Sequence, residues 1–137
     1  MTLRDQLIRD EGGFRLKPYT DSVGKLTIGA GRNLTDVGIS HAEAELLLDN
    51  DIAGASADVA ARLPWVGALS VPRAAVLVNL AFNMGIGGLM GFRKMLQALQ
   101  DEQWETAAAE LLASTYAEQV GPRAHRLALQ LRTDTWV

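Results

Sequence analysis

The stretch EGGFRLKPYTDSVGKLTIGAG, residues 11–31, decides how the rest of this chain is interpreted. It opens with Glu11 and two glycines, which end an N-terminal helical pattern that begins after Thr2. Short β-prone segments separated by proline and glycine follow, and they predict a small antiparallel sheet. The stretch therefore changes from helix to sheet while it supplies one carboxyl group at Glu11, a second at Asp21 and a hydroxyl group at Thr27.

Beyond this stretch the pattern is helical. Ser40 and Glu43 form a capping box ahead of an apolar stripe that runs to Leu63, which predicts one helix over residues 40–63. At about 1.5 Å per residue such a helix exceeds about 30 Å, enough to connect two lobes. Its many acidic side chains are expected to form a solvated face.

The C-terminal half predicts a helical bundle. Ser70 caps a segment that is apolar nearly all round, and Gly85 is expected to end that helix. The glycines that follow predict a loop at residues 87–91, ahead of amphipathic segments at 92–99 and 104–112. A last helix is expected to start at 121–122. Aromatic residues at helical spacing are usually core, so the three tryptophans are expected there.

Together these elements predict an α+β fold that is mainly helical, in one domain spanning residues 1–137. We expect a small β lobe at about 13–39, a bridging helix at about 40–63, and a helical lobe made of residues 1–12 and 64–137. A cleft is expected between the two lobes. A chain of this length buries roughly two thirds of its unfolded surface, so it can form a core without covalent cross-links.

Composition excludes several classes of function. The chain has no cysteine, and its two histidines, His41 and His125, lie far apart, so neither a disulfide nor a metal site is expected. The net charge is −3, and residues 36–58 contain six acids and no base, which argues against a nucleic-acid partner. The longest apolar run, near 74–82, is too short to span a bilayer, and residues 1–13 lack the apolar core of a secretory signal.

Two carboxyl groups on either side of a cleft are what glycoside hydrolysis requires. One must keep its proton and give it to the leaving oxygen, while the other stays ionised and directs water or stabilises positive charge. Glu11 is expected on the apolar face of a helix and Asp21 in a polar turn, which suits that division of roles. An acidic pair of this kind is weak evidence alone, since most such pairs are solvated surface residues.

The residues resemble those of the phage-type lysozymes, glycoside hydrolase family 24. The motifs that carry the resemblance occur in the family's order over essentially the whole chain: Asp10-Glu11-Gly12, residues 15–19 (RLKPY), Asp21, residues 24–29 (GKLTIG) with Gly31, residues 79–85 (NLAFNMG), Arg132-Thr133 and Thr135-Trp136. This resemblance implies a muramidase that cleaves the β-1,4 bond between N-acetylmuramic acid and N-acetylglucosamine in peptidoglycan. It implies no cofactor.

The resemblance also implies roles for individual residues. Glu11 would be the general acid, and Asp21 with Thr27 would hold the attacking water on the opposite face of the sugar, which gives inversion and a carboxyl separation of roughly 6.5 to 9.5 Å. Arg123 matches a family arginine that approaches the catalytic glutamate. The remaining residues expected to bind substrate are Gly31, Arg32, Phe82, Asn83, Met84, Tyr116 and Gln119.

The chain departs from the family pattern near the site. Nine residues separate Glu11 from Asp21 where the family usually has eight, and Gly12-Gly13-Phe14 is the expected place of the extra residue. Arg32 stands where some members have histidine. Two alternatives therefore stay open: a catalytically inactive peptidoglycan-binding protein on the same fold, and a lytic transglycosylase, which works with a single acid.

The biological setting follows from the resemblance alone. It implies an endolysin that stays in the host cytoplasm until lysis and reaches periplasmic peptidoglycan with the help of a holin. The expected partners are peptidoglycan glycan strands, with no nucleic acid and no stable membrane insertion. We expect a monomer.

Overall fold

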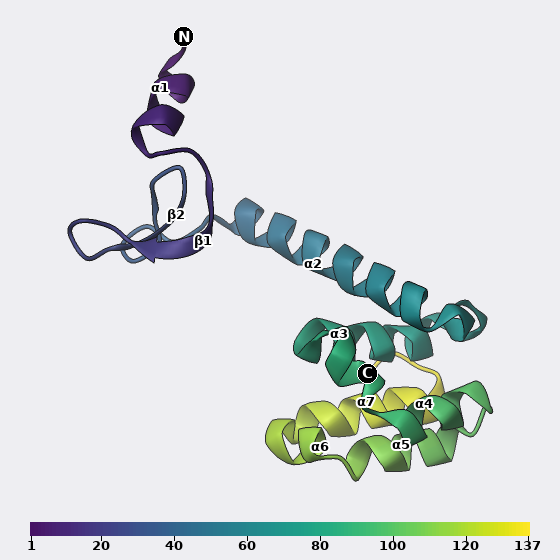
Figure 1. The fold of residues 1–137 in the computed structure, drawn as a ribbon. Helices are drawn as coiled ribbons and strands as arrows, with labels where there is room; N and C mark the ends of the chain where they lie inside the picture. The colour runs from purple at the N-terminus through teal and green to yellow at the C-terminus, as the bar shows by residue number, and fades with distance from the viewer. The chain divides into compact units, whose positions relative to one another are not determined.

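The computed structural model describes all 137 residues, which form two compact units, Met1–Leu47 (unit 1) and Leu48–Val137 (unit 2). The boundary falls inside helix α2 (His41–Arg62), so this helix begins in unit 1 and ends in unit 2. A small three-stranded sheet lies in unit 1, and all other elements are helical (Figure 1). The predicted α+β fold, mainly helical, is confirmed.

Unit 1 starts with helix α1 (Leu3–Asp10), which begins where the sequence predicts and ends at Asp10, two residues before the predicted stop at Gly12-Gly13. Thr2 and Asp5 form the capping box: the Asp5 backbone N–H donates to the Thr2 hydroxyl, and Asp5 Oδ2 accepts from the Thr2 backbone N–H at 2.9 Å. The Thr2 hydroxyl also donates to Asp5 Oδ2 at 2.7 Å, and this bond, together with the one from the Thr2 backbone N–H, lowers the pKa of Asp5. Helix α1 buries none of its residues, so the association of residues 1–12 with the helical lobe stays a prediction.

The sheet of unit 1 is antiparallel, with the strand order β1 (Arg15–Thr20), β2 (Leu26–Gly29), β3 (Arg32–Asn33). Strand β1 is therefore an edge strand. Its pairing with β2 is irregular between Arg15 and Tyr19, and Pro18 lies in this irregular stretch. Proline cannot donate to a strand ladder, so an edge strand at an irregular position is where it is tolerated.

Helix α2 begins with the predicted capping box. Glu43 N–H donates to Ser40 Oγ at 3.1 Å, and Glu43 Oε1 accepts from the Ser40 backbone N–H at 2.9 Å. The helix continues to Arg62, and Leu63 follows it ahead of a short 3₁₀ helix, η1 (Pro64–Ala68). The single helix expected over residues 40–63 is therefore present, except for one residue at each end.

Unit 2 is a helical bundle with one continuous core. Besides the end of α2 and η1, its elements are α3 (Val71–Met90), α4 (Arg93–Gln100), α5 (Trp104–Leu112), α6 (Thr115–Val120) and α7 (Pro122–Thr133). Helix α7 packs against α3, α5 and α6, and α4 packs against α5 (Figure 1). The core side of α7 is the predicted one: Ala124, Leu127, Ala128 and Leu131 are all buried. Helix α6 and η1 were not predicted.

Helix α3 lies at the centre of this core but differs from the prediction at its end. Gly85 breaks the helical geometry, as expected, with φ 77° and ψ 165°. The loop predicted at residues 87–91 is wrong, because helix resumes after Gly85 and runs to Met90. By length and composition α3 could cross a bilayer, yet in this structure it supplies buried residues such as Val76, Leu77 and Leu80 to the core.

One arginine ties three helices of unit 2 together. Arg73 on α3 donates from Nε to the backbone oxygen of Leu131 at 2.8 Å, near the end of α7. Its guanidinium also lies 3.8 Å from the ring centroid of Trp104, the first residue of α5. Arg73 thereby satisfies a carbonyl at a helix end while it covers an aromatic face.

Candidate active site

Asp21 occupies the turn between β1 and β2. Its Oδ1 accepts two hydrogen bonds, from the backbone N–H of Val23 at 3.0 Å and from that of Lys25 at 2.8 Å. The Asp21 backbone N–H in turn donates to the Lys25 oxygen at 2.8 Å. An aspartate that bonds backbone groups a few residues ahead stabilises a tight turn. The turn therefore fixes the carboxylate through one oxygen and leaves Oδ2 without a partner in the turn.

Thr27 lies on β2 and is anchored to the same residue of the turn. Its hydroxyl donates to the Lys25 backbone oxygen at 2.9 Å, and its exposed fraction is 3%. Because the only hydroxyl proton is used in this bond, the oxygen remains free to accept. Lys25 thus connects the side chains of Asp21 and Thr27, which the sequence predicted as partners.

Glu11 follows the last residue of α1, and its side chain reaches the turn between β2 and β3. A Cβ atom added to Gly31 would lie 2.8 Å from Cδ of Glu11 and 3.0 Å from Oε1. Gly31 has φ +82°, a conformation that glycine adopts without strain. Because Gly31 lacks a side chain, the carboxyl group of Glu11 can occupy the space beside it. In unit 1 Glu11 is exposed, so the apolar setting expected for it stays a prediction.

The side chain of Arg32, on β3, forms hydrogen bonds with residues at and just before the start of α2. Its Nη1 donates to Glu43 Oε1 at 2.7 Å and to the Gly38 oxygen at 3.2 Å. The hydrogen bond from Arg32, helped by those from Ser40, lowers the pKa of Glu43 from 4.5 to about 2, and the same contact raises the pKa of Arg32. A sugar contact for Arg32 stays a prediction.

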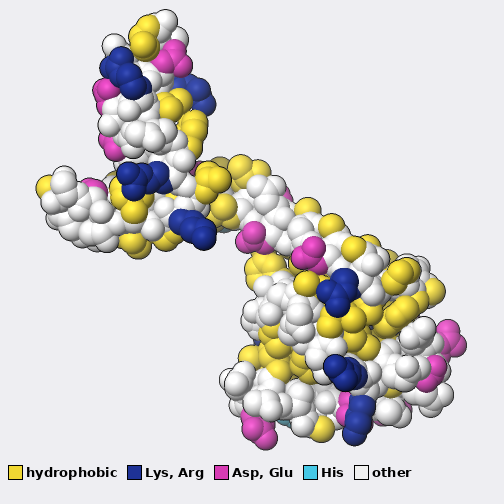
Figure 2. Space-filling model, viewed as in Figure 1, with side chains coloured by type: hydrophobic (Ala, Val, Ile, Leu, Met, Phe, Trp, Pro, Cys, Tyr) yellow, Lys and Arg dark blue, Asp and Glu magenta, His cyan; other side chains and the backbone are white.

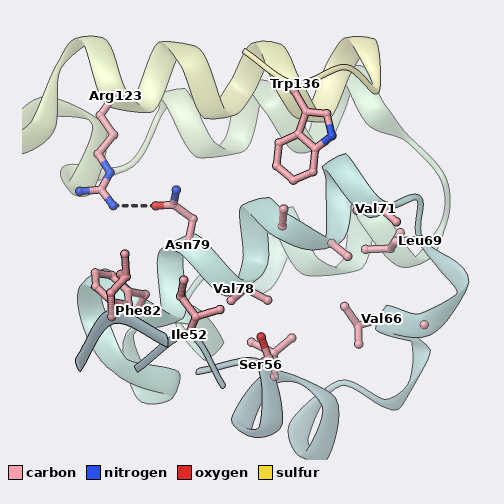
Figure 3. Close-up of a pocket in the computed structure, with 15 residues that line it drawn as sticks. Ile52, Ser56, Val66, Leu69, Val71, Val78, Asn79, Phe82, Arg123 and Trp136 are labelled. Atoms are coloured by element: carbon pink, nitrogen blue, oxygen red, sulfur yellow. Dashed lines mark hydrogen bonds between the residues drawn. The ribbon is translucent and has the colours of Figure 1, made fainter. Parts of the chain in front are cut away.

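The other predicted substrate-binding residues lie in unit 2, which contains an apolar groove of about 760 Å³. Phe82 and Arg123 line it, as do Ile52 on α2 and Val66 on η1 (Figure 3). Arg123 Nη2 donates to Asn79 Oδ1 at 2.6 Å at one end of the groove. The structure therefore brings Phe82 and Arg123 together, on α3 and α7.

The remaining predicted residues do not line this groove. Asn83 and Gln119 are exposed, on α3 and α6, and Met84 is half-buried just before the break at Gly85. Tyr116 has an exposed fraction of 6% and packs edge-on against Phe92, with ring centroids 6.2 Å apart. Its hydroxyl has no hydrogen-bond partner. Substrate contacts for these four residues stay predictions.

Among the groove residues that were not predicted to belong to a site are one polar and one aromatic residue, Asn79 and Trp136. Asn79 is the partner of Arg123, and its signal in the sequence was a single polar residue within the apolar run 74–82. Trp136 lines the groove with an exposed fraction of 66%, so its expected place in the core is wrong. Trp136 comes after the end of α7, where helical spacing no longer predicts burial.

No group of three or more His, Asp or Glu side chains lies where it could hold a metal ion. The polar groups that unit 1 gathers around the turn are carboxyl and hydroxyl oxygens together with backbone N–H groups. Such groups can transfer protons and orient water.

A small antiparallel sheet, a long helix and a helical bundle in this order form a lysozyme-like α+β fold. The chain belongs to the phage lysozyme family, whose model matches residues 9–130. That match covers Glu11, Asp21 and Thr27 in unit 1 and Asn79, Phe82 and Arg123 in unit 2. Membership supports a lysozyme-like function acting on peptidoglycan.

Proteins similar to this chain differ in the share of their own length that the similarity covers. The pre-baseplate central spike protein Gp5 of Enterobacteria phage T4 is 30% identical over 161 residues, which cover 97% of this chain but only 28% of the phage protein. Probable T4-type lysozyme 2 of Dictyostelium discoideum is 29% identical, over 98% of this chain and 95% of its own length. Probable T4-type lysozyme 1 of the same organism is 24% identical over the same shares.

Proposed function

We propose that this chain is a muramidase that hydrolyses the β-1,4 bond between N-acetylmuramic acid and N-acetylglucosamine in peptidoglycan. The observation that carries the proposal is the connection of Asp21 and Thr27 through Lys25. The backbone N–H of Lys25 donates to the Asp21 carboxylate, and its oxygen accepts from the Thr27 hydroxyl. Two groups suited to holding water are thus fixed by one residue of the turn.

In the proposed mechanism a water molecule lies between Asp21 and Thr27. Asp21 Oδ2, which has no partner in the turn, accepts a proton from the water as the water attacks the anomeric carbon. The Thr27 oxygen accepts a hydrogen bond from the second O–H of the water, because its own hydroxyl hydrogen is already used in the bond to the Lys25 backbone oxygen. This arrangement favours a water nucleophile over the internal ring closure that a transglycosylase performs.

Glu11 is the proposed general acid, which protonates the glycosidic oxygen as the bond to the anomeric carbon breaks. Its side chain is limited on one side by Gly31, whose missing Cβ leaves the space that the carboxyl occupies. Attack by water on the face opposite the leaving group inverts the anomeric configuration, and the proposal requires a carboxyl separation of roughly 6.5 to 9.5 Å in the active enzyme.

The proposed role is lysis of a bacterial host at the end of phage growth. The enzyme stays in the host cytoplasm until another factor, such as a holin, opens the inner membrane and lets it reach periplasmic peptidoglycan. This setting rests on the resemblance of the sequence to the phage-type lysozymes alone.

The test is Glu11→Gln, which preserves size and removes the transferable proton. We expect the rate of clearing of chloroform-permeabilised Gram-negative cells to fall by about a hundredfold or more, with an unchanged circular dichroism spectrum. Asp10→Asn is the matched control, since Asp10 is the neighbouring exposed carboxylate, paired with Arg9 at 3.0 Å. It should clear cells at nearly the parental rate.

Product analysis separates the proposal from its alternatives. A reducing end that first appears with inverted anomeric configuration supports hydrolysis, whereas a 1,6-anhydro end indicates a transglycosylase. Binding to peptidoglycan without any cleavage by the parental protein indicates an inactive binding protein on this fold. A Glu11→Gln protein that clears cells at the parental rate contradicts the assignment of the acid.

A further inference from the structure

The charges of unit 1 leave two neighbouring cations of strand β1 without an acidic partner. Unit 1 contains six Lys and Arg residues, of which three are paired: Arg9 with Asp10, Lys25 with Asp36 and Arg32 with Glu43. Arg4 is unpaired and lies on α1. The other two unpaired cations, Arg15 and Lys17, lie in one strand and are both exposed.

Arg15 is oriented by an aromatic ring, and no acidic side chain pairs with its charge. Its guanidinium lies 4.3 Å from the ring centroid of Tyr19, which is four residues further along β1. Stacking of this kind fixes the orientation of the guanidinium while its N–H groups remain free to donate. Lys17 lies between these two residues in the irregular stretch of the strand. Figure 2 shows Lys and Arg side chains over the strands of unit 1.

The free edge of β1 is unsuited to pairing with another strand. Pro18 lacks a backbone donor, and the pairing of β1 is irregular around it. A partner of this edge is therefore recognised by side chains and not by a backbone ladder. The side chains available are two cations and one aromatic ring.

Strand β1 leads directly into the proposed site, because Thr20 ends the strand and Asp21 begins the turn. A glycan that reaches Asp21 therefore brings its substituents near β1. In peptidoglycan, the muramic acid residues carry peptide stems, and free carboxylates are the anionic groups of those stems. Guanidinium and ammonium groups are the natural partners of carboxylates.

We propose that Arg15 and Lys17, oriented by Tyr19, form a binding strip on β1 for the carboxylates of the peptide stems of peptidoglycan. This inference rests on the proposed function, because it assumes that peptidoglycan is the substrate. It gives this acidic protein a local cationic contact for an anionic polymer, despite a net charge of −3. The strip adds affinity and selectivity for glycan that still carries its stems, and it takes no part in bond cleavage.

The test measures binding to insoluble sacculi from Gram-negative cells, which have no wall teichoic acid. All proteins carry Glu11→Gln, so that the sacculi stay intact, and each is measured by co-sedimentation. One sample of sacculi is native, and in the other the carboxylates are converted to neutral amides with a carbodiimide and methylamine. The double variant Arg15→Gln/Lys17→Gln is compared with the matched control Arg93→Gln/Lys94→Gln, which removes two exposed, unpaired cations of unit 2.

We expect the β1 double variant to bind native sacculi about fivefold more weakly than its parent at low salt. The loss should exceed that of the control, vanish on amidated sacculi, and shrink in about 1 M salt, where the Debye length is about 3 Å. Lys17→Gln alone, which leaves the Arg15–Tyr19 contact intact, should lose about twofold. Arg15→Lys should bind more weakly than the parent but more tightly than the double variant, because it keeps the charge and loses the planar stacking on Tyr19.

An equal loss on native and amidated sacculi, a loss no larger than that of the control, or no loss at all would overturn the inference. Absence of any binding by the parent overturns it as well. A different result would contradict the proposed function. In that case the protein with Glu11 intact would leave native sacculi uncleaved. Cleavage by the parent together with unchanged binding of the β1 variant would reject the strip and leave the muramidase proposal standing.

Discussion

A Cβ atom on Gly31 would lie 2.8 Å from Cδ of Glu11, so the carboxyl group of Glu11 occupies the space that a side chain at position 31 would need. This contact joins the residue after α1 to the turn between β2 and β3. It means that the place of the proposed acid is set by the absence of a side chain elsewhere in unit 1.

Gly31→Ala should therefore displace Glu11 and lower activity. We expect about a tenfold or larger loss of kcat/KM on peptidoglycan, because small misplacements of a reacting group are costly. The variant should also lose about 1 kcal/mol of unfolding free energy, since φ +82° is strained for alanine. Turbidity assays and urea unfolding measure the two effects.

Gly38→Ala is the control for backbone strain. Gly38 has φ +68°, but a Cβ atom there meets nothing within 4 Å. It should lose a similar amount of stability and keep its activity. Equal activity losses in the two variants would show that backbone strain, and not the contact with Glu11, accounts for the effect.

The Asp21 turn could be predicted from sequence because all its contacts are local. Asp21, Lys25 and Thr27 lie within seven residues, and an aspartate before a glycine-containing segment is a known turn signal. The contact of Arg123 with Asn79 joins residues 44 positions apart, and no local pattern predicts such a pair. Helix periodicity placed both residues on helices but did not pair them.

Asp21→Asn separates the chemistry of this residue from its part in the turn. An asparagine Oδ1 can accept from the same two backbone N–H groups, so the melting temperature should stay close to that of the parent. Activity should fall by about a hundredfold or more, because an amide does not accept the proton of the attacking water.

Asp21→Ala is the comparison. It removes both hydrogen bonds to the turn and should lower the unfolding free energy by about 1–2 kcal/mol in addition to the loss of activity. Urea unfolding with parallel turbidity assays distinguishes the two variants. An asparagine variant with parental activity would exclude Asp21 as the base.

The wrong prediction of a loop at residues 87–91 has a physical cause. Glycine disfavours helix by about 1 kcal/mol per residue, which made several glycines look like a loop. Here the helix resumes because Leu89 is fully buried in the core, and because Gly88 allows close packing on Met84. Tertiary packing therefore overrides a local preference that the sequence expresses clearly.

Gly88→Ala and Gly87→Ala test this explanation as a pair. A Cβ at position 88 would lie 2.6 Å from the Cβ of Met84, an atom next to the backbone that cannot move aside alone. We expect Gly88→Ala to lower the unfolding free energy by about 1–3 kcal/mol. A Cβ at position 87 meets nothing within 4 Å, so Gly87→Ala should raise it by up to about 1 kcal/mol. Thermal unfolding of both variants decides, and a destabilised Gly87→Ala protein would argue against a regular helix here.

The ion pair between Arg32 and Glu43 predicts a pH dependence of stability. The pKa of Glu43 is lowered from 4.5 to about 2, so the folded state binds its proton less readily than the unfolded state does. The stabilisation from ionised Glu43 is therefore complete above about pH 5 and is lost as the pH falls from 4.5 towards 2. Both side chains are partly exposed, with 39% and 43% of their surface accessible, so solvent screening reduces the effect.

Glu43→Gln should accordingly lower the melting temperature at pH 7, and the difference from the parent should narrow steadily below about pH 4.5. Glu45→Gln is the control, since Glu45 contacts only His41 on the exposed side of α2 and should shift the melting temperature much less at pH 7. Because the Arg32 hydrogen bond is the largest single contribution to the lowered pKa, ahead of those from Ser40, Arg32→Gln should reduce the pH dependence that separates Glu43→Gln from the parent. A melting-temperature difference between the parent and Glu43→Gln that is as large at pH 2 as at pH 7 would contradict the role assigned to this pair.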